Sequence, residues 1–288
     1  MAEALEFEGT EGNRLAADLR GSEGQPVILL HGGGQTRHSW KGSAQQLSER
    51  GMRAITIDLR GHGQSDWLNS GYYRFRDYAA DAKVVFEQIE VQFGVKPIAV
   101  GASLGGISSL LAEGEAADAL LNGLVLVDIT PRMDPGGVSK ILSFMGDRIH
   151  DGFATIEEAG EAIARYLPHR VKPTSLDGLR KNLRLGEDGR YRWHWDPRFL
   201  NGPNSVHSDH EESERRLVAA ARNLRIPVQL VRGGKSELVS KEHADEFMQM
   251  VPHALYYDVS EAGHMVAGDK NDVFCQAVLS FVEHIKAA

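Results

Sequence analysis

The 288-residue sequence predicts an α/β fold, with a mostly parallel central sheet, helices on both faces and an inserted helical cap. Short, continuous apolar runs recur along the chain, as expected of strands buried on both faces. Segments with the helical spacing of apolar residues separate these runs. Glycine or polar residues follow them, at the strand ends where open α/β sheets bind ligands.

Strand and helix patterns alternate along most of the chain. Residues 4–8 and 14–19 flank Glu11-Gly12-Asn13, which predicts a hairpin. Buried strands are predicted at 26–30, 54–57, 98–100, 124–127, 228–231 and 255–257. Apolar faces with helical spacing comprise Tyr78, Ala82, Val85, Phe86 and Ile89, and later Phe274, Val278, Phe281, Val282 and Ile285.

The alternation stops after Asp128 and resumes at Ile226. A stretch of about 90 residues is too long for a loop, so we interpret 131–222 as the cap and 1–130 with 223–288 as the core. Within this stretch Tyr191, Trp193 and Trp195 alternate with polar residues and would share one face of an extended segment. They either line a substrate pocket or form the core of the cap itself.

The composition is that of an ordinary globular protein, with 42% hydrophobic and 25% charged residues and a net charge of −8. No basic cluster appears, which argues against nucleic acid or a membrane surface as a partner. One cysteine, Cys275, allows no internal disulfide and fits a reducing compartment. Residues 1–9 lack a signal-peptide pattern, and no apolar run reaches the ~18 residues of a membrane span. We therefore expect a cytoplasmic protein, of an oligomeric state that the sequence leaves open.

A candidate nucleophile, Ser103, lies at the centre of the stretch 100–106, VGASLGG. An apolar strand pattern precedes it and a helical pattern follows it. Glycines at 101 and 105 let the two backbones approach closely, because they carry no side chain. A serine held at such a strand-to-helix turn presents its hydroxyl as a nucleophile.

A serine nucleophile needs a general base, which an acid must orient. His264 follows the last predicted strand and lies at the same sheet edge as Ser103. For the acid we favour Glu237, which follows the strand 228–231 after a short turn. Asp128, at the end of the strand before the cap, is the alternative.

Charge that develops on an attacked carbonyl oxygen needs N–H donors fixed in advance. The backbone N–H of Leu104 lies at a helix N-terminus and is one candidate. The second comes from His31-Gly32-Gly33-Gly34, with Gly33 favoured and Gly34 as the alternative. No phosphate-loop, dinucleotide or metal-site spacing is fulfilled, so we expect no cofactor and no metal.

Four motifs in this order resemble the α/β-hydrolase superfamily: HGGG at 31–34, DLRGHGQSD at 58–66, GASLGG at 101–106 and AGH at 262–264. The resemblance implies a Ser-His-acid triad and a cap that shapes the pocket. It departs at the acid, because the family usually carries Asp where this chain has Glu237. Related epoxide and haloalkane hydrolases carry Asp in place of Ser103, which argues against both reactions.

We expect a serine hydrolase that cleaves a carboxylic ester or lactone through an acyl-enzyme, with a small-molecule, mostly apolar substrate. The same triad would serve a C–C bond hydrolase or a cofactor-free perhydrolase. A non-catalytic ligand-binding receptor on this fold is the alternative from another class.

Overall fold

The computed structural model describes residues 2–166, 176, 178–264, 266 and 271–287. Its core is an eight-stranded sheet in the order β1-β2-β4-β3-β5-β6-β9-β10. Strands β1 and β2 pair antiparallel, as do β2 and β4, and all other neighbours are parallel. The predicted α/β class is thereby confirmed. The strands are β1 (Glu3–Glu8), β2 (Arg14–Arg20), β3 (Pro26–Leu30), β4 (Arg53–Ile57), β5 (Ile98–Ala102), β6 (Gly123–Val127), β9 (Val228–Gly233) and β10 (Leu255–Val259).

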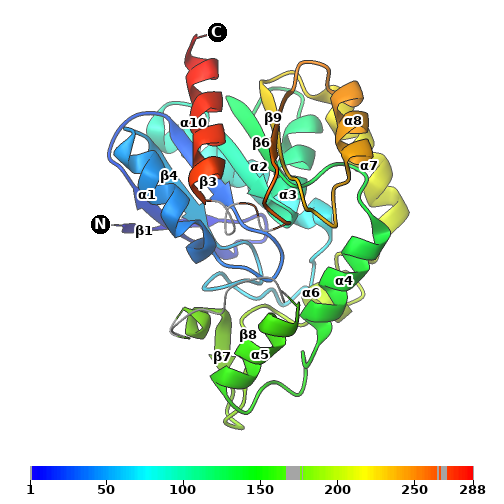
Figure 1. Ribbon diagram of the computed structural model, residues 1–288. Coiled ribbons are helices and arrows are strands. Elements are labelled where there is room, and N and C mark those ends of the chain that lie inside the picture. The colour runs from blue at the N-terminus through cyan, green and yellow to red at the C-terminus, as the bar shows by residue number, and fades with distance from the viewer. Residues whose placement is uncertain (1, 167–175, 177, 265, 267–270, 288) are drawn as a thin grey trace.

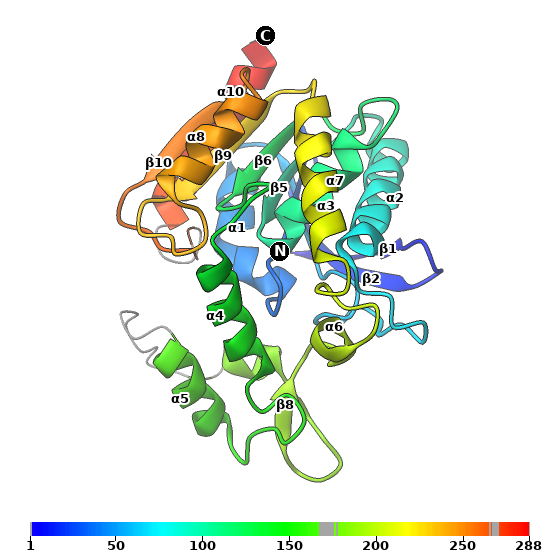
Figure 2. The ribbon, with the colours of Figure 1, turned by 90° about the vertical axis from the view of Figure 1, so that its right-hand side faces the viewer.

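Helices cover both faces of this sheet (Figures 1 and 2). One face carries α1 (Lys41–Glu49), after the short helix η1 (Arg37–Trp40), together with α10 (Asn271–Ala287). The other carries α2 (Phe75–Phe93), α3 (Leu104–Gly114), α7 (His210–Asn223) and α8 (Lys241–Met250). No helix in the described part of the chain has the length and apolar character that crossing a membrane requires.

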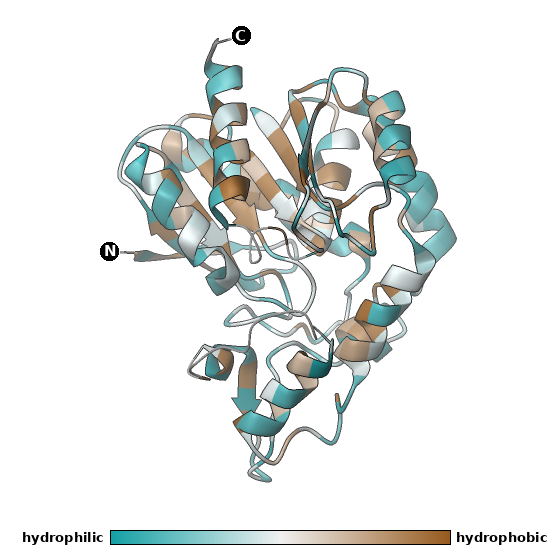
Figure 3. Ribbon diagram, viewed as in Figure 1, coloured by the Kyte–Doolittle hydropathy of each residue, from teal (hydrophilic) through white to brown (hydrophobic). Residues whose placement is uncertain are grey.

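Strand β3 shows why the sheet is buried on both faces. Val27 and Leu29 pack in the cluster on the α1 and α10 side, whereas Ile28 and Leu30 pack in the cluster on the other side. Successive side chains of a strand point to opposite faces, so an unbroken apolar run fits a strand between two helix layers. The sheet strands are accordingly among the most hydrophobic parts of the ribbon (Figure 3).

The chain between β6 and α7 forms a separate layer at one edge of the sheet (Figure 1). It contains α4 (Pro135–Gly146), α5 (Ile156–Tyr166), η2 (Leu179–Asn182), β7 (Leu183–Leu185), β8 (Tyr191–Trp193) and α6 (Arg198–Asn201). Strands β7 and β8 pair antiparallel, an element that the sequence did not predict.

Helix α7 falls within the predicted cap range, 131–222, but packs on α3 of the core. Arg216 of α7 forms an ion pair with Glu115 at 2.7 Å. A Cβ atom on Gly114 would lie 2.3 Å from the carbonyl oxygen of Ala220, so the two backbones are in close contact. The part of the cap that stands away from the sheet therefore ends before α7. The limits given above for the cap and the core stay a prediction.

Candidate active site

The turn between β5 and α3 holds Ser103 in a strained conformation. A Cβ atom on Gly101 would lie 2.5 Å from the carbonyl carbon of Gly105, and one on Gly105 would lie 2.3 Å from the carbonyl oxygen of Leu30. Neither position accepts a side chain. Ser103 itself has φ 45° and ψ −114°, which costs a residue with a side chain about 1–3 kcal/mol. The close approach of strand and helix thus places the serine at the tip of the turn.

Asp128, directly after β6, is the second strained residue at this sheet edge. Its φ is 49°, and among the described residues only Ser103, Asp128 and Arg148 combine a side chain with a positive φ. The side chain is fully buried. Its Oδ1 accepts a hydrogen bond from the backbone N–H of Gly233 at 2.9 Å, and its Oδ2 accepts one from Ser236 Oγ at 2.5 Å.

His264 completes this cluster from the segment that follows β10. Its Nδ1 lies 2.7 Å from Asp128 Oδ2. A carboxylate can only accept, so the proton of the neutral imidazole is on Nδ1. The other ring nitrogen, Nε2, is then the basic one, which is the tautomer that a general base for a serine requires.

Glu237, the acid that the sequence favoured, does not contact His264, and the structure corrects that preference. Its side chain is 63% exposed, and its carboxylate bonds to Lys140 Nζ of α4 at 2.6 and 2.8 Å. The strand order explains why Asp128 takes this place. Strand β6 lies between β5 and β9, so the residue that follows β6 is next to both the loop after β5 and the loop after β9. By position 237 the chain after β9 has turned toward the cap, and Ser236 is the residue that points back to Asp128.

The 31–34 loop after β3 lies against the serine turn. The N–H of Gly105 donates to the carbonyl oxygen of His31 at 3.1 Å, and a Cβ atom on Gly32 would lie 3.4 Å from Ser103 Cβ. The N–H of Gly34 donates to His62 Nε2 at 3.1 Å, so it is occupied and does not fit the alternative donor role. For the N–H groups of Gly33 and Leu104 we find no acceptor within the described residues, so both are available to a substrate oxygen.

Two buried histidines hold the 31–34 loop in place through hydrogen bonds. His31 Nδ1 donates to the carbonyl oxygen of Gly32 at 2.8 Å, while its Nε2 accepts from the N–H of Leu59 at 3.0 Å. His62 donates from Nδ1 to the carbonyl oxygen of Arg60 and accepts from Gly34. Burial lowers the pKa of His31 to about 4 and that of His62 to about 3, so both rings are neutral at neutral pH.

A third buried histidine, His194, reaches the same loop from the cap. Its Nδ1 accepts from the N–H of Gly63 at 2.7 Å, and its Nε2 lies 3.3 Å from the carbonyl oxygen of Gly34. Burial holds the pKa of His194 well below its usual value of 6.5. No role was predicted from the sequence for His62 or His194. The one signal in the sequence was the position of His62 within the motif after β4.

Cap side chains cover the 31–34 loop. A Cβ atom on Gly33 would lie 3.1 Å from Phe199 Cζ. One on Gly34 would lie 2.9 Å from Met145 Cε and 3.3 Å from Trp195 Cζ3. All three cap side chains are buried. The space beside the loop is therefore apolar and tightly filled.

The three aromatic residues expected in the substrate pocket have different surroundings. Trp193 packs edge-on against Phe144 and Phe153 and stacks on Trp195, with ring centroids 5.1 Å apart. The backbone of Tyr191 pairs with that of Phe153. Trp193 and Tyr191 thus belong to the core of the cap, which was the alternative reading. Trp195 alone of the three reaches the 31–34 loop.

Comparison with known proteins places the chain in a family. A family model described as the alpha/beta hydrolase fold matches residues 25–270. The chain belongs to this family. The match covers most of the sheet, including the turn that holds Ser103.

Members of the α/β-hydrolase family similar to this chain include two bacterial enzymes. Esterase Rv0045c of Mycobacterium tuberculosis is 28% identical over 92% of this chain and 85% of its own. The 2-(acetamidomethylene)succinate hydrolase of Mesorhizobium japonicum is 27% identical over 94% of this chain and 92% of its own. The crystal structure of an E-2-(acetamidomethylene)succinate hydrolase superimposes with a TM-score of 0.79 at 24% identity, covering 98% of this chain and 100% of that one.

Proposed function

We propose that this protein is a serine hydrolase that cleaves a carboxylic ester or lactone through an acyl-enzyme, with a small-molecule, mostly apolar substrate. Ser103 is the nucleophile, His264 the general base and Asp128 the acid that orients it. Gly33 and Leu104 supply the oxyanion donors. The hydrogen bond between Asp128 and His264, at the sheet edge where Ser103 is held in a strained turn, carries this proposal.

The proposed reaction proceeds in two halves. Ser103 Oγ attacks the carbonyl carbon as His264 Nε2 takes the hydroxyl proton, and the N–H groups of Gly33 and Leu104 bind the oxyanion. His264 then returns the proton to the departing alcohol, which leaves the acyl group on Ser103. In the second half, His264 takes a proton from water as the water oxygen attacks the acyl carbonyl carbon. The ester bond to Ser103 then breaks, His264 returns the proton to Ser103 Oγ and the acid is released.

The named relatives support ester cleavage over the other reactions considered. One is an esterase, and others are named as sn-1-specific diacylglycerol lipase and protein phosphatase methylesterase. The apolar side chains beside the 31–34 loop suit a substrate whose acyl part is apolar. Lactone cleavage and C–C bond hydrolysis would use the same groups on a different bond. Perhydrolysis would use them on the same ester bond, with hydrogen peroxide in place of water.

Labelling with a fluorophosphonate tests this function directly. We expect stoichiometric phosphonylation of the peptide that carries Ser103, turnover of p-nitrophenyl esters by the wild type, and neither in Ser103→Ala. Saturable binding of esters without labelling or turnover would contradict the proposal and favour a non-catalytic receptor. Turnover of a diketone panel without ester turnover would instead favour a C–C hydrolase.

A further inference from the structure

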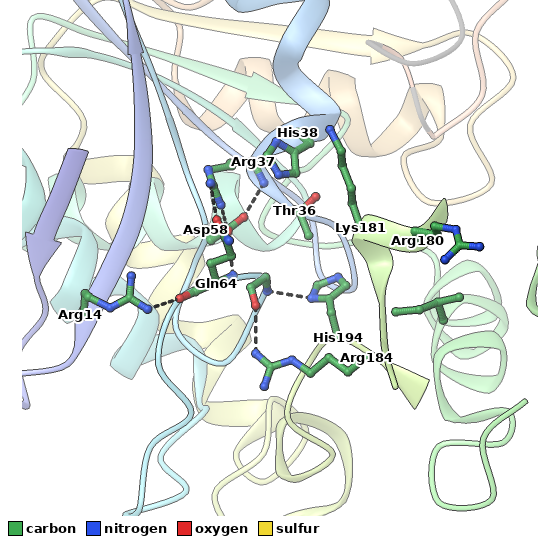
Figure 4. A pocket seen from close by; sticks show the side chains of 12 residues that line it. Arg14, Thr36, Arg37, His38, Asp58, Gln64, Arg180, Lys181, Arg184 and His194 are labelled. Atoms are coloured by element: carbon green, nitrogen blue, oxygen red, sulfur yellow. Dashed lines mark hydrogen bonds and ion pairs between the residues drawn. The ribbon is translucent and has the colours of Figure 1, made fainter. Parts of the chain in front are cut away.

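A cavity of about 500 Å³ lies between the core and the cap (Figure 4). It is lined by the loop after β3, the loop after β4 and the cap segment 180–184, with His194. Ser103, Asp128 and His264 are not among its lining residues. His194 bonds to the carbonyl oxygen of Gly34, whereas Gly32 faces Ser103. The 31–34 loop therefore separates this cavity from the catalytic serine.

The cavity gathers positive charge in a protein whose net charge is −8. Its lining includes five cationic side chains and a single carboxylate: Arg14, Arg37, Arg180, Lys181, Arg184 and Asp58. The cations come from three regions that are far apart in the sequence, as Figure 4 shows. Folding alone brings them together.

Two of these cations are already paired. Arg37 forms ion pairs with Asp58 at 2.5 Å and with Asp18 at 3.1 Å. Arg14 forms one with Glu6 at 3.2 Å. These contacts fix the core wall of the cavity and leave it little net charge.

The three cations of the cap wall are different. Within the described residues no carboxylate lies at ion-pair distance from Arg180, Lys181 or Arg184. Arg184 is held by a hydrogen bond to the carbonyl oxygen of Gly63 at 2.9 Å and by stacking on the Trp67 ring at 4.5 Å. The cavity therefore has an excess of positive charge on one preorganised and two exposed side chains.

Burial is the main cause that lowers the pKa of the two imidazoles in the cavity, and nearby cations lower it further. Burial, together with the charges of Arg37 and Lys181, lowers the pKa of His38. Burial is also the main cause that lowers the pKa of His194, to which Arg184 adds. Both rings therefore stay neutral, and an anion in the cavity would meet the guanidinium and ammonium groups.

We propose that this cavity is a second binding site, for a small molecule that carries at least two anionic oxygen groups. Guanidinium groups bind the oxygens of phosphate and of carboxylate in the same two-point geometry, so the shared chemistry is a multivalent oxyanion. The volume falls within the ~300–1,000 Å³ of small-molecule sites, which leaves room for more than one such group.

Calorimetric titration of the whole chain with pyrophosphate and with citrate tests this site. It needs no ester and no turnover, so its outcome is independent of the proposed hydrolysis. The variant Arg180→Gln/Lys181→Gln removes two exposed charges of the cavity. The matched control Arg215→Gln/Lys241→Gln removes two exposed charges elsewhere.

We expect saturable binding to the wild type and to the control, and binding weaker by about tenfold or more in the cavity variant, since a charge-assisted hydrogen bond contributes ~1.5–3 kcal/mol. Binding of pyrophosphate alone would identify the ligand group as phosphoryl, and binding of citrate alone as carboxylate. No binding of either probe, or equal weakening in both double variants, would overturn the proposal.

Discussion

Backbone strain marks the residues proposed to act together. Ser103 and Asp128 end adjacent parallel strands, and both have a positive φ, at 45° and 49°. Such conformations persist only where the surrounding structure over-determines them. Here the packing of Gly101 on Gly105 fixes the serine, and three hydrogen bonds fix the Asp128 carboxylate. The strain at these two positions is part of how the site is organised in advance.

Replacing Ser103 by glycine should separate this strain from catalysis. Ser103→Gly should abolish ester turnover and raise the free energy of unfolding by about 1 kcal/mol, because glycine adopts a positive φ without a steric penalty. Urea unfolding and ester turnover measure the two effects. Ser103→Ala is the control, since it loses the hydroxyl but keeps the strained Cβ. Equal stability of the two variants would show that the backbone at 103 is not strained.

At the residue scale, sequence order suffices to nominate Ser103 and His264 but not the acid. Both acidic candidates follow a strand and precede the histidine in the chain, so sequence order does not separate them. Strand order does, because β6 lies between β5 and β9. The sequence order also could not exclude Gly34 as an oxyanion donor. Its N–H already donates a hydrogen bond to His62, which lies 28 positions away in the sequence. Long-range pairing of this kind leaves no local signal.

Helix α4 links the segment after β9 to the 31–34 loop. At its N-terminus, the N–H of Asp134 donates to the carbonyl oxygen of Leu238 at 2.9 Å, and Lys140 pairs with Glu237. Near its C-terminus, Met145 packs against Gly34. The backbone hydrogen bond of Asp134 joins α4 to the core, the exposed ion pair of Glu237 adds a further contact, and Met145 places the other end of α4 against the 31–34 loop.

Shortening Met145 should therefore change substrate selectivity. In Met145→Ala, the space freed beside Gly33 and Gly34 should raise kcat/KM for long-chain acyl esters relative to acetate, measured with p-nitrophenyl esters. The loss of a buried methionine should also cost about 2–5 kcal/mol of stability. Met52 is as buried as Met145 but packs on the α1 and α10 side, so Met52→Ala is the control. An unchanged ester preference in Met145→Ala would show that this side chain does not limit the acyl site.

At the element scale, apolar runs predicted the strands β3, β4, β5, β6 and β9, which are buried because both of their faces are covered, and also the strand β10. The predicted burial of β10 is wrong: it is an edge strand of the sheet, and its first four residues are exposed. The cap strands β7 and β8 were missed. Each has three residues and is largely half-buried or exposed, so neither has a continuous apolar run. The sequence singled out Trp193 and Trp195 as candidate pocket residues. Whether an aromatic ring lines a pocket or packs in the core of the cap depends on the fold, which the local sequence does not reveal.

At the scale of the whole molecule, buried neutral histidines couple stability to pH. His31 and His62 have a pKa of about 4 and about 3 in the folded protein, against 6.5 for an ordinary histidine. Below pH 6.5 the unfolded chain binds protons that the folded protein does not bind. Stability that is fully present above pH 6.5 is therefore lost as the pH falls toward the folded pKa values.

We expect these two histidines together to lower the free energy of unfolding by about 4 kcal/mol between about pH 7.5 and about pH 5, as measured by urea unfolding. His62→Gln keeps a neutral polar side chain but cannot titrate. It should remove about half of this pH dependence, whatever its effect on stability at neutral pH. The same pH dependence in the variant and the wild type would contradict the assignment of His62 as a buried neutral ring.

The clustering of charged side chains in space also cannot be predicted from the sequence. No basic cluster appears in the linear order, yet Arg14, Arg37 and Arg184 line one cavity. The sheet brings the loops after β3 and β4 together, and the cap segment 180–184 closes over them. Net charge and local runs therefore describe the average surface, and the fold alone decides where charges of one sign meet.

The identity of the acid is the central claim about the site, and one comparison of ester turnover tests it. Asp128→Asn should lower kcat by about 10⁴ with little change in KM, because the amide favours the wrong tautomer of His264. Glu237→Gln should leave kcat within about twofold of the wild type, since an exposed ion pair contributes little. A large loss in Glu237→Gln together with near-normal turnover in Asp128→Asn would contradict the proposed triad.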